Sequence, residues 1–247
     1  MKRFAAGPVI VGVLVTALGW ELIGRLHAFG SAWAPLSTVI AYAFTPANGA
    51  LLLSAALRTG SEALAGLLMG SLAGFALASC AVLVPRLARG LGTFASLING
   101  IPIIAVAGVC ALTVPRGGTP IVVATLAAGF IVFVASAAGL ASTLAVQRDL
   151  FAVLGASRAA TFRRLLVPCA LPAILDGVRT AAPSSVVGAI IGEWFSAETG
   201  LGPLLVAAMQ NYAIAQLWAV ALTGALLSIA AYTLLGGLRA AVGTRFG

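Results

Sequence analysis

Residues 147–172, QRDLFAVLGASRAATFRRLLVPCALP, interrupt a chain that is otherwise almost entirely apolar. Four of the fourteen basic residues of the protein lie in this stretch: Arg148, Arg158, Arg163 and Arg164. Arginine clusters between apolar segments are typical of the cytoplasmic loops of membrane proteins. We therefore expect residues 147–172 to lie outside the lipid, where another protein can bind them.

The same stretch predicts two short helices joined by a turn. The first runs from Asp149 to Leu154, with its acidic residue at the N-terminal end, where the helix dipole favours a negative charge. Gly155 forms the turn, Ser157 is a candidate cap for the second helix, and Pro168 should end that helix. The second helix is amphipathic, because its large apolar side chains recur at spacings of three and four residues. A plain solvated basic loop is the alternative that these features leave open.

Residues 149–168 resemble the cytoplasmic loop of permease subunits of binding-protein-dependent ABC transporters. That loop reads Glu-Ala-Ala, three residues, Gly, nine residues, Ile, one residue and Leu-Pro. Gly155 and Pro168 match in register, Leu165 and Val167 are conservative replacements, and residues 149–151 read Asp-Leu-Phe instead of Glu-Ala-Ala. The resemblance extends over about residues 51–238 and is strongest to the nitrate/sulfonate/taurine branch, which also contains thiamine-precursor permeases.

The resemblance implies that residues 147–172 form a coupling loop that docks on a cytoplasmic ATPase. The residues that it assigns to this contact are Asp149, Leu150, Phe151, Gly155, Ala156, Ser157, Arg158 and Pro168. It also implies a type I importer fold, an extracytoplasmic solute-binding protein and a second permease subunit, for which a homodimer is expected and a heterodimer stays open.

Composition independently places the chain in a lipid bilayer. The 247 residues are 61% hydrophobic and 8% charged, with a mean hydropathy of +1.12. A helix needs ~20 mainly apolar residues to cross ~30 Å of hydrocarbon. We expect an all-α polytopic membrane protein with one domain, residues 1–247, and six spans. The expected spans are residues 4–26, 62–84, 91–114, 119–146, 173–192 and 215–238.

Two apolar stretches need a separate interpretation. Residues 4–26 follow a basic start, as in a secretory signal, but the run is longer than the usual signal core, which favours an uncleaved first span. Residues 29–58 contain Pro35 and Pro46, and neither half is long enough to span, so one or two short helices on the outer face are expected there.

Basic residues predict the orientation of the spans. With six spans and the N-terminus inside, only Arg25, Arg58 and Arg116 lie outside, and Arg179 lies at the base of the fifth span. The inside then holds Lys2, Arg3, Arg86, Arg89, Arg148, Arg158, Arg163, Arg164, Arg239 and Arg245. This asymmetry predicts cytoplasmic termini and a cytoplasmic coupling loop in a bacterial inner membrane.

Polar and helix-breaking residues inside the spans mark a candidate translocation pathway. Asn99 and Pro102 interrupt the third span, and Ser184 and Ser185 lie beside a proline in the fifth. A freed backbone carbonyl must be satisfied by a neighbouring helix or a cavity. Glu193 follows the fifth span and is interpreted either as a pathway residue or as an interfacial carboxylate beside an aromatic anchor.

Two further motifs predict a helix contact and a class of solute. Gly66, Gly70 and Gly74 repeat every fourth residue, which predicts close approach of another helix, with an ordinary lipid-facing helix as the alternative. Residues 192–194, Gly-Glu-Trp, resemble family members that carry thiamine precursors or related heterocycles.

Enzymatic function is not expected. Lys2 is the only lysine, so a P-loop lysine is absent, and His27 is the only histidine. No metal or cofactor is expected, and nucleic acid is excluded because the +8 charge comes from arginines between spans. The chain is therefore interpreted as an ABC importer permease driven by a partner ATPase. A stand-alone secondary transporter or channel with Glu193 as its ion site is the alternative. The solute stays open among heterocycles, sulfonates, taurine and nitrate.

Overall fold

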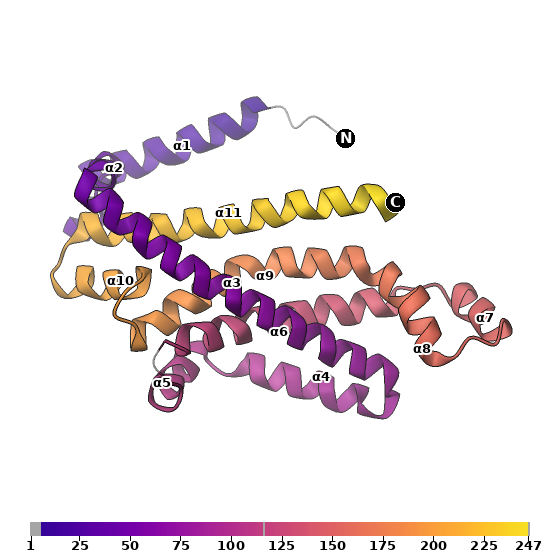
Figure 1. Cartoon of the computed structure of the whole chain (residues 1–247). Coiled ribbons are helices and arrows are strands. Elements are labelled where there is room, and N and C mark those ends of the chain that lie inside the picture. Colours follow the sequence, from indigo (N-terminus) through magenta and orange to yellow (C-terminus); the bar gives the residue numbers. More distant parts are fainter. Residues whose placement is uncertain (1–5, 116, 247) are drawn as a thin grey trace.

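The computed structural model describes residues 6–115 and 117–246, and every regular element in those ranges is a helix. The longer helices run along one axis of an elongated molecule (Figure 1). Their bounds are α1 Ala6–Arg25, α2 Leu36–Phe44, α3 Pro46–Leu83, α4 Pro85–Gly100, α5 Ile103–Thr113, α6 Thr119–Ala141, α7 Ala145–Val153, α8 Arg158–Thr161, α9 Val167–Ser196, α10 Leu201–Gln210 and α11 Ile214–Phe246. A short 3₁₀ turn, Gly30–Ala32, precedes α2, and a π-helix, Phe162–Leu166, joins α8 to α9.

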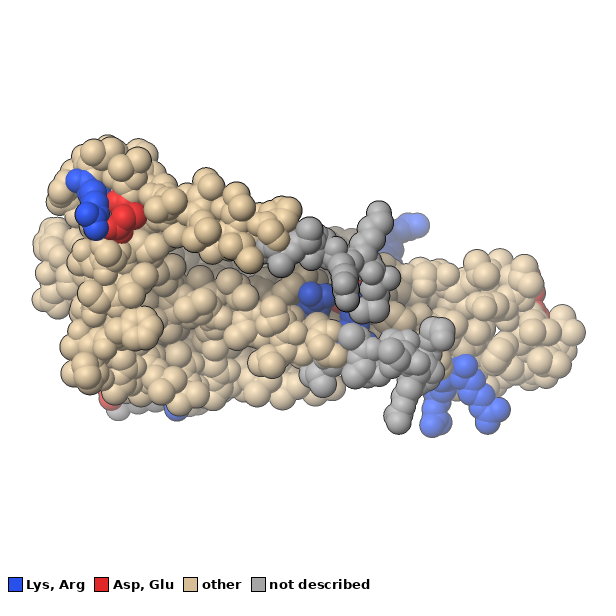
Figure 2. All heavy atoms as spheres, turned by 90° about the horizontal axis from the view of Figure 1, so that it is seen from above, with Lys and Arg blue, Asp and Glu red and all other residues tan. Residues whose placement is uncertain are grey.

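The two ends of the molecule differ. One end carries α7 and α8, and we call it the loop end; the opposite end carries α2 and α10, and we call it the far end (Figure 1). Viewed from above, most of the drawn surface is uncharged. Blue basic side chains lie near the middle and toward the loop end, and a blue side chain lies beside a red one at the far end (Figure 2). A mostly uncharged surface suits a molecule that lies largely in lipid.

The core is formed by α3, α6 and α9, which pack through small residues. A Cβ on Gly70 would lie 2.6 Å from the Thr125 carbonyl oxygen, and one on Gly74 would lie 2.5 Å from the Gly129 carbonyl oxygen. Gly66 approaches Ala124 of α6 in the same way. The glycine stripe therefore brings α3 against α6, as predicted, and the lipid-facing alternative is wrong.

In the described part of the chain, four helices are long and apolar enough to cross a membrane: α3, α6, α11 and the continuous helical segment 158–196 that includes α9. A fifth span exists if α4 and α5 count together, although they meet at 88°. Helix α1 has twenty residues, the length that a span requires, so six spans stay a prediction.

The third predicted span is interrupted at Pro102, as the sequence indicated, and forms two helices, α4 and α5. Ile101 adopts an extended conformation, with φ −76° and ψ 129°, between α4 and α5. Pro102 explains the break, because its ring disfavours a helical conformation at the preceding residue and it has no N–H to donate.

The second span begins earlier than predicted. Residues 46–58, expected to form a separate short helix, instead form the start of the 38-residue α3. Pro46 occupies the first turn of α3, where a missing N–H costs nothing. Only the 3₁₀ turn and α2 remain as short elements before α3.

The prediction that Pro168 ends a helix is also wrong. The chain is helical without interruption from Arg158 to Ser196. In the π-helix before Pro168, the Val167 N–H donates to the Phe162 carbonyl, five residues back. This widened turn places Pro168 in the first turn of the resumed α-helix, where no N–H is required.

Candidate functional site

The turn of the coupling loop has the predicted geometry. Gly155 has φ +69°, and its N–H donates to the Ala152 carbonyl at 3.0 Å. The Ser157 hydroxyl accepts a hydrogen bond of 3.2 Å from the Ala160 N–H, so it caps α8. A left-handed glycine followed by a serine cap reverses the chain sharply between α7 and α8.

Asp149 does not begin a helix, contrary to the prediction. Helix α7 starts four residues earlier, at Ala145, and Asp149 lies at its middle. The break with α6 comes at residues 142–144, where the Arg148 guanidinium donates to the carbonyls of Leu140 and Ala141 at 3.2 Å each. Arg148 thereby satisfies the last carbonyls of α6, a role that the sequence did not suggest.

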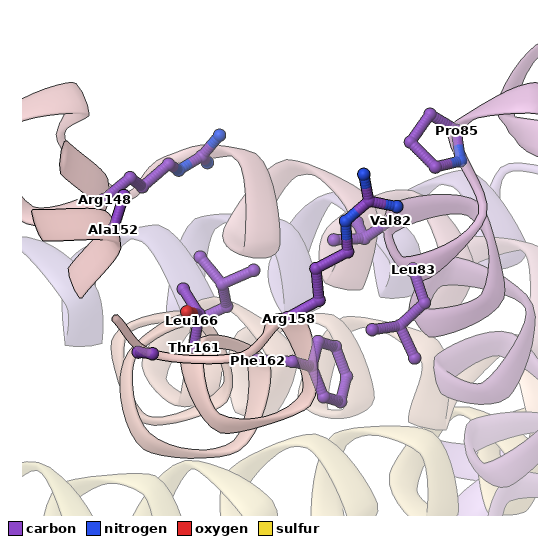
Figure 3. A pocket seen from close by; sticks show the side chains of 10 residues that line it. Val82, Leu83, Pro85, Arg148, Ala152, Arg158, Thr161, Phe162 and Leu166 are labelled. Atoms are coloured by element: carbon purple, nitrogen blue, oxygen red, sulfur yellow. The ribbon is translucent and has the colours of Figure 1, made fainter. Parts of the chain in front are cut away.

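A pocket of about 450 Å³ lies beside the turn at Gly155 (Figure 3). Arg148 and Arg158 reach its mouth from α7 and α8, and Leu83, Phe162 and Leu166 contribute apolar walls. The pocket therefore combines an apolar interior with a basic rim.

Exposed apolar side chains extend the same surface. Leu150 and Leu154 are exposed, whereas Phe151 turns inward and packs on the cluster that contains Leu140 and Leu165. Of the predicted coupling residues, those from 149 to 158 gather at this end, and Pro168 lies on α9, one π-turn further along. Exposed apolar groups beside a basic rim are typical of a protein contact.

Glu193 lies at the far end of α9 and is fully buried. The Thr59 hydroxyl donates to its Oε1 at 2.7 Å, and the Gly202 N–H donates to its Oε2 at 2.8 Å. Thr59 itself accepts a hydrogen bond of 3.0 Å from the Leu201 N–H. The carboxylate thus joins α9 to α3 and to the first turn of α10.

Glycines let the α9–α10 connection approach this carboxylate. Gly200 has φ +128°, and a Cβ there would overlap the Glu193 carboxylate. A Cβ on Gly202 would lie 2.6 Å from the Glu193 Cβ and 2.7 Å from the Ile190 carbonyl oxygen. Only glycine fits at both positions without moving α10 away from α9.

A second buried carboxylate, Glu62, lies close enough to Glu193 to interact with it. Arg58, one turn earlier on α3, places its Nε 2.7 Å from Glu62 Oε1. The Glu62 oxygens have no further hydrogen-bond partner among the described residues. The sequence interpretation missed Glu62 by treating it as the boundary of a span, although its spacing from Arg58 is that of a helical ion pair.

The other predicted pathway residues lie elsewhere. Asn99 and Pro102 are exposed at the α4–α5 break. Ser184 is half-buried, and the buried Ser185 donates to the Ala182 carbonyl at 2.7 Å. Ser185 lines a cavity of about 300 Å³ between α3, α9 and α11. The other predicted pathway residues do not line this cavity.

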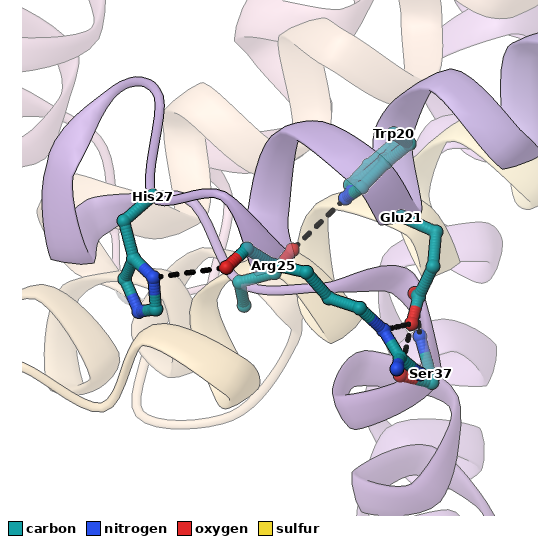
Figure 4. Close-up of polar contacts among 6 residues, drawn as sticks. Trp20, Glu21, Arg25, His27 and Ser37 are labelled. Atoms are coloured by element: carbon teal, nitrogen blue, oxygen red, sulfur yellow. Dashed lines mark hydrogen bonds and ion pairs between the residues drawn. The ribbon is translucent and has the colours of Figure 1, made fainter.

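Polar contacts also fasten α1 to α2 at the far end (Figure 4). Glu21 accepts hydrogen bonds from the Arg25 Nε at 2.6 Å and from the Ser37 N–H at 2.9 Å. His27 lies with its Nδ1 3.1 Å from the Arg25 carbonyl oxygen. Trp20 donates to the Ala34 carbonyl at 3.0 Å. Among the residues that the structure describes, no group of three or more His, Cys, Asp or Glu side chains could hold a metal ion.

Comparison with known proteins gives a family. Residues 66–247 match the model of the binding-protein-dependent transport system inner membrane component. A probable ABC transporter permease protein of Haemophilus influenzae is 28% identical over 226 residues, which cover 91% of each chain. The formylaminopyrimidine transport permease protein ThiX of Halalkalibacterium halodurans is 47% identical over 64 residues, or 26% of each chain. The riboflavin transport system permease protein RibX of Chloroflexus aurantiacus is 27% identical over 151 residues, or 61% of this chain and 56% of that protein.

Solved structures show the same fold. A chain from an inward-facing structure of the MetNI methionine ABC transporter superimposes with a TM-score of 0.72 at 16% identity, covering 81% of this chain and 99% of that one. The all-helical architecture is therefore that of a type I importer permease. The chain belongs to the family of binding-protein-dependent transport system inner membrane components, as the membrane-spanning translocation subunit of an ABC importer.

Proposed function

We propose that the loop end docks on a cytoplasmic ATPase dimer and that the far end faces an extracytoplasmic solute-binding protein. The observation that carries this proposal is the loop-end surface, where Gly155 reverses the chain beside exposed Leu150 and Leu154. The adjoining pocket, with Arg148 and Arg158 at its mouth, offers positive charge to acidic groups of a partner. The proposed docking residues are those predicted from the sequence: Asp149, Leu150, Phe151, Gly155, Ala156, Ser157, Arg158 and Pro168.

Transport is inward and driven by the partner. ATP binding closes the ATPase pair, the loop end follows, and the cavity between two permease subunits changes the side that it faces. A second copy of this chain is the proposed partner permease, because the resemblance to binding-protein-dependent permeases implies a pair of such subunits.

The pathway is proposed to run past the α4–α5 break and past the part of α9 that contains Pro183. Asn99 and Pro102 lie at the α4–α5 break, where a span that does not continue straight needs water or protein to satisfy its backbone. Ser184 and Ser185 lie at the α9 proline. Glu193 contributes from the far end, where its two oxygens are both engaged. Because both oxygens accept hydrogen bonds from Thr59 and Gly202, a secondary transporter that uses Glu193 as an ion site has little structural support.

The proposed solute is a small planar heterocycle. Two relatives are named for formylaminopyrimidine and riboflavin transport, and both names denote heteroaromatic molecules. We expect the binding protein that co-purifies with this permease to bind one of these two compounds, and to bind neither taurine nor nitrate, in calorimetric titrations. Binding of taurine or nitrate alone would return the solute to the sulfonate or nitrate class.

Replacement of Gly155 tests the docking proposal. No atom lies within 4 Å of a Cβ built at Gly155, so its positive φ alone makes a substitution costly. Gly155→Val should be strained by on the order of 1–2 kcal/mol, whereas Gly155→Asn should be tolerated, since asparagine visits this conformation. We expect the valine variant to retain less ATPase on the purified permease, or to take up less solute per ATP hydrolysed.

Controls separate docking from folding. Gly92→Ala in α4 adds a methyl group in open space at an ordinary φ and should change neither measurement. All variants are compared at equal amounts in the membrane. If Gly155→Val retains the ATPase and couples hydrolysis to uptake normally, residues 147–172 are only a solvated basic loop.

A further inference from the structure

The far end contains an open pocket of about 320 Å³, which is separate from the loop-end pocket and from the Ser185 cavity. One wall is α3, with Leu51 and Arg58. The other is formed by the α9–α10 connection and the first turns of α10, with Glu198, Pro203 and Leu204. Its volume falls at the lower end of the range, roughly 300–1,000 Å³, that small-molecule sites occupy.

Arg58 offers hydrogen-bond donors to this pocket. Its Nε is used by the buried Glu62 at 2.7 Å, which fixes the position of the guanidinium. The side chain is 51% exposed, and its terminal N–H groups have no hydrogen-bond partner among the described residues. Arginine has five N–H donors and no acceptor, so the free groups can bind only an acceptor.

Glu198 offers the opposite chemistry. It is exposed on the α9–α10 connection, and an ionised carboxylate only accepts hydrogen bonds. A ligand that meets both side chains must therefore carry an acceptor and a donor. Leu51, Pro203 and Leu204 give the pocket apolar surface for the faces of a flat ring.

Charge disfavours an anionic ligand. Arg58 is already paired with Glu62, so its positive charge is largely compensated. Glu198 adds a negative charge to the lining. A nitrate or sulfonate group entering here would meet no uncompensated positive charge among the described side chains and would be repelled by Glu198.

The wall opposite α3 is held in place by Glu193. The Gly202 N–H donates to Glu193, and the Leu201 N–H donates to Thr59, so the segment that carries Glu198 and Pro203 is fastened to α9 and α3. Glu193 therefore acts on this pocket as a positioning residue.

We propose that this pocket is a receiving site for the solute, an uncharged planar heterocycle with amino or amide groups. Its acceptor edge meets Arg58, its donor edge meets Glu198, and its ring lies against Leu51, Pro203 and Leu204. The inference rests on the proposed import of a heterocycle and adds the place where such a solute first binds the permease.

Protection from labelling tests the site without the binding protein. Thr199→Cys places a thiol on the rim in a variant whose Cys80, Cys110 and Cys169 are replaced, and the permease is kept with its ATPase in lipid nanodiscs. Formylaminopyrimidine or riboflavin should slow maleimide labelling of this thiol, whereas taurine and nitrate should not. Phe44→Cys, exposed at the same end, should label at an unchanged rate with every compound.

A pair of charge changes makes the test specific. Whichever heterocycle slows labelling in the parent permease should be needed at about tenfold or more higher concentration to slow it in Glu198→Gln, because a hydrogen bond to a charged acceptor is lost. Glu21→Gln removes the same charge at the same end but outside the pocket, and should leave that concentration unchanged. Binding of the ATPase to each variant is verified before labelling. A lack of protection then counts against the proposed pocket and not against the proposed ATPase docking. Absence of protection by both heterocycles, or an equal effect of Glu21→Gln, overturns the proposal.

Discussion

At the scale of single residues, the most consequential side chain is Glu193. Its position directly after a span led to two interpretations, a pathway residue and an interfacial anchor. The structure shows a buried carboxylate that caps the first turn of α10 and accepts a hydrogen bond from Thr59. An acceptor at a helix N-terminus is favourable because the first N–H groups of a helix have no internal partner.

This arrangement predicts coupling between Glu193 and Thr59. Glu193→Gln leaves one oxygen to accept from Thr59 but turns an NH₂ group toward the Gly202 N–H, so two donors face each other. We expect the variant to lose about 1–3 kcal/mol of stability, the usual cost of an unsatisfied buried group. Thr59→Val should lose a similar amount, because the Leu201 N–H and the Glu193 Oε1 each lose their hydrogen bond to Thr59, whereas Thr59→Ser should behave as wild type.

Thermal unfolding of the purified permease in detergent measures these effects. Because the two side chains share one network, the double variant Glu193→Gln/Thr59→Val should be less destabilised than the sum of the single variants. Additive losses would show that the two residues stabilise the far end independently, contrary to the proposed joint attachment of α10.

At the scale of elements, the sequence predicted what depends on local chemistry. The turn at Gly155, the Ser157 cap and the glycine stripe on α3 were predicted correctly, since each follows from a backbone conformation or from side-chain size. The apolar stretches likewise identified the long helices. Prolines were the main source of error. Pro102 breaks a helix, as predicted, whereas Pro46 and Pro168 lie in first turns where breaks were expected. These different effects depend on neighbouring turns that composition does not reveal.

The two candidate sites also differ in how far the sequence predicted them. The loop-end residues were predictable because they are contiguous in sequence. The far-end network was not predictable, because Glu193 lies more than 130 residues along the chain from Thr59 and Glu62. Arg148 was counted as a loop charge, and its role as a cap of α6 depends on where that helix stops.

At the scale of the whole molecule, helix length requires that both ends leave the bilayer. Helix α3 has 38 residues, which at 1.5 Å per residue extends about 57 Å, well beyond the ~30 Å of the hydrocarbon core. The segment 158–196, with 39 residues, is equally long. The loop-end pocket and the far-end pocket therefore lie toward opposite aqueous phases, where an ATPase and a solute could reach them separately.

The charge distribution predicts which phase each end meets. Arg86 and Arg89 begin α4 at the loop end, next to the arginines of α7, α8 and the π-helix, whereas Arg25 and Arg58 lie at the far end. Basic residues are retained on the cytoplasmic side, so the loop end should be cytoplasmic. Phe44 and Val153 are exposed at the two ends, 83% and 85% respectively, and suit cysteine probes in a cysteine-free permease.

In right-side-out vesicles, a membrane-impermeant maleimide should label Phe44→Cys, and should label Val153→Cys only after the membrane is opened with detergent. Both probes should react fully in detergent, which verifies that each thiol is accessible. Labelling of Val153→Cys in sealed vesicles would place the loop end outside, away from ATP. An ATPase could not then dock on Gly155 and its neighbours, so the orientation and the proposed coupling surface depend on the same result.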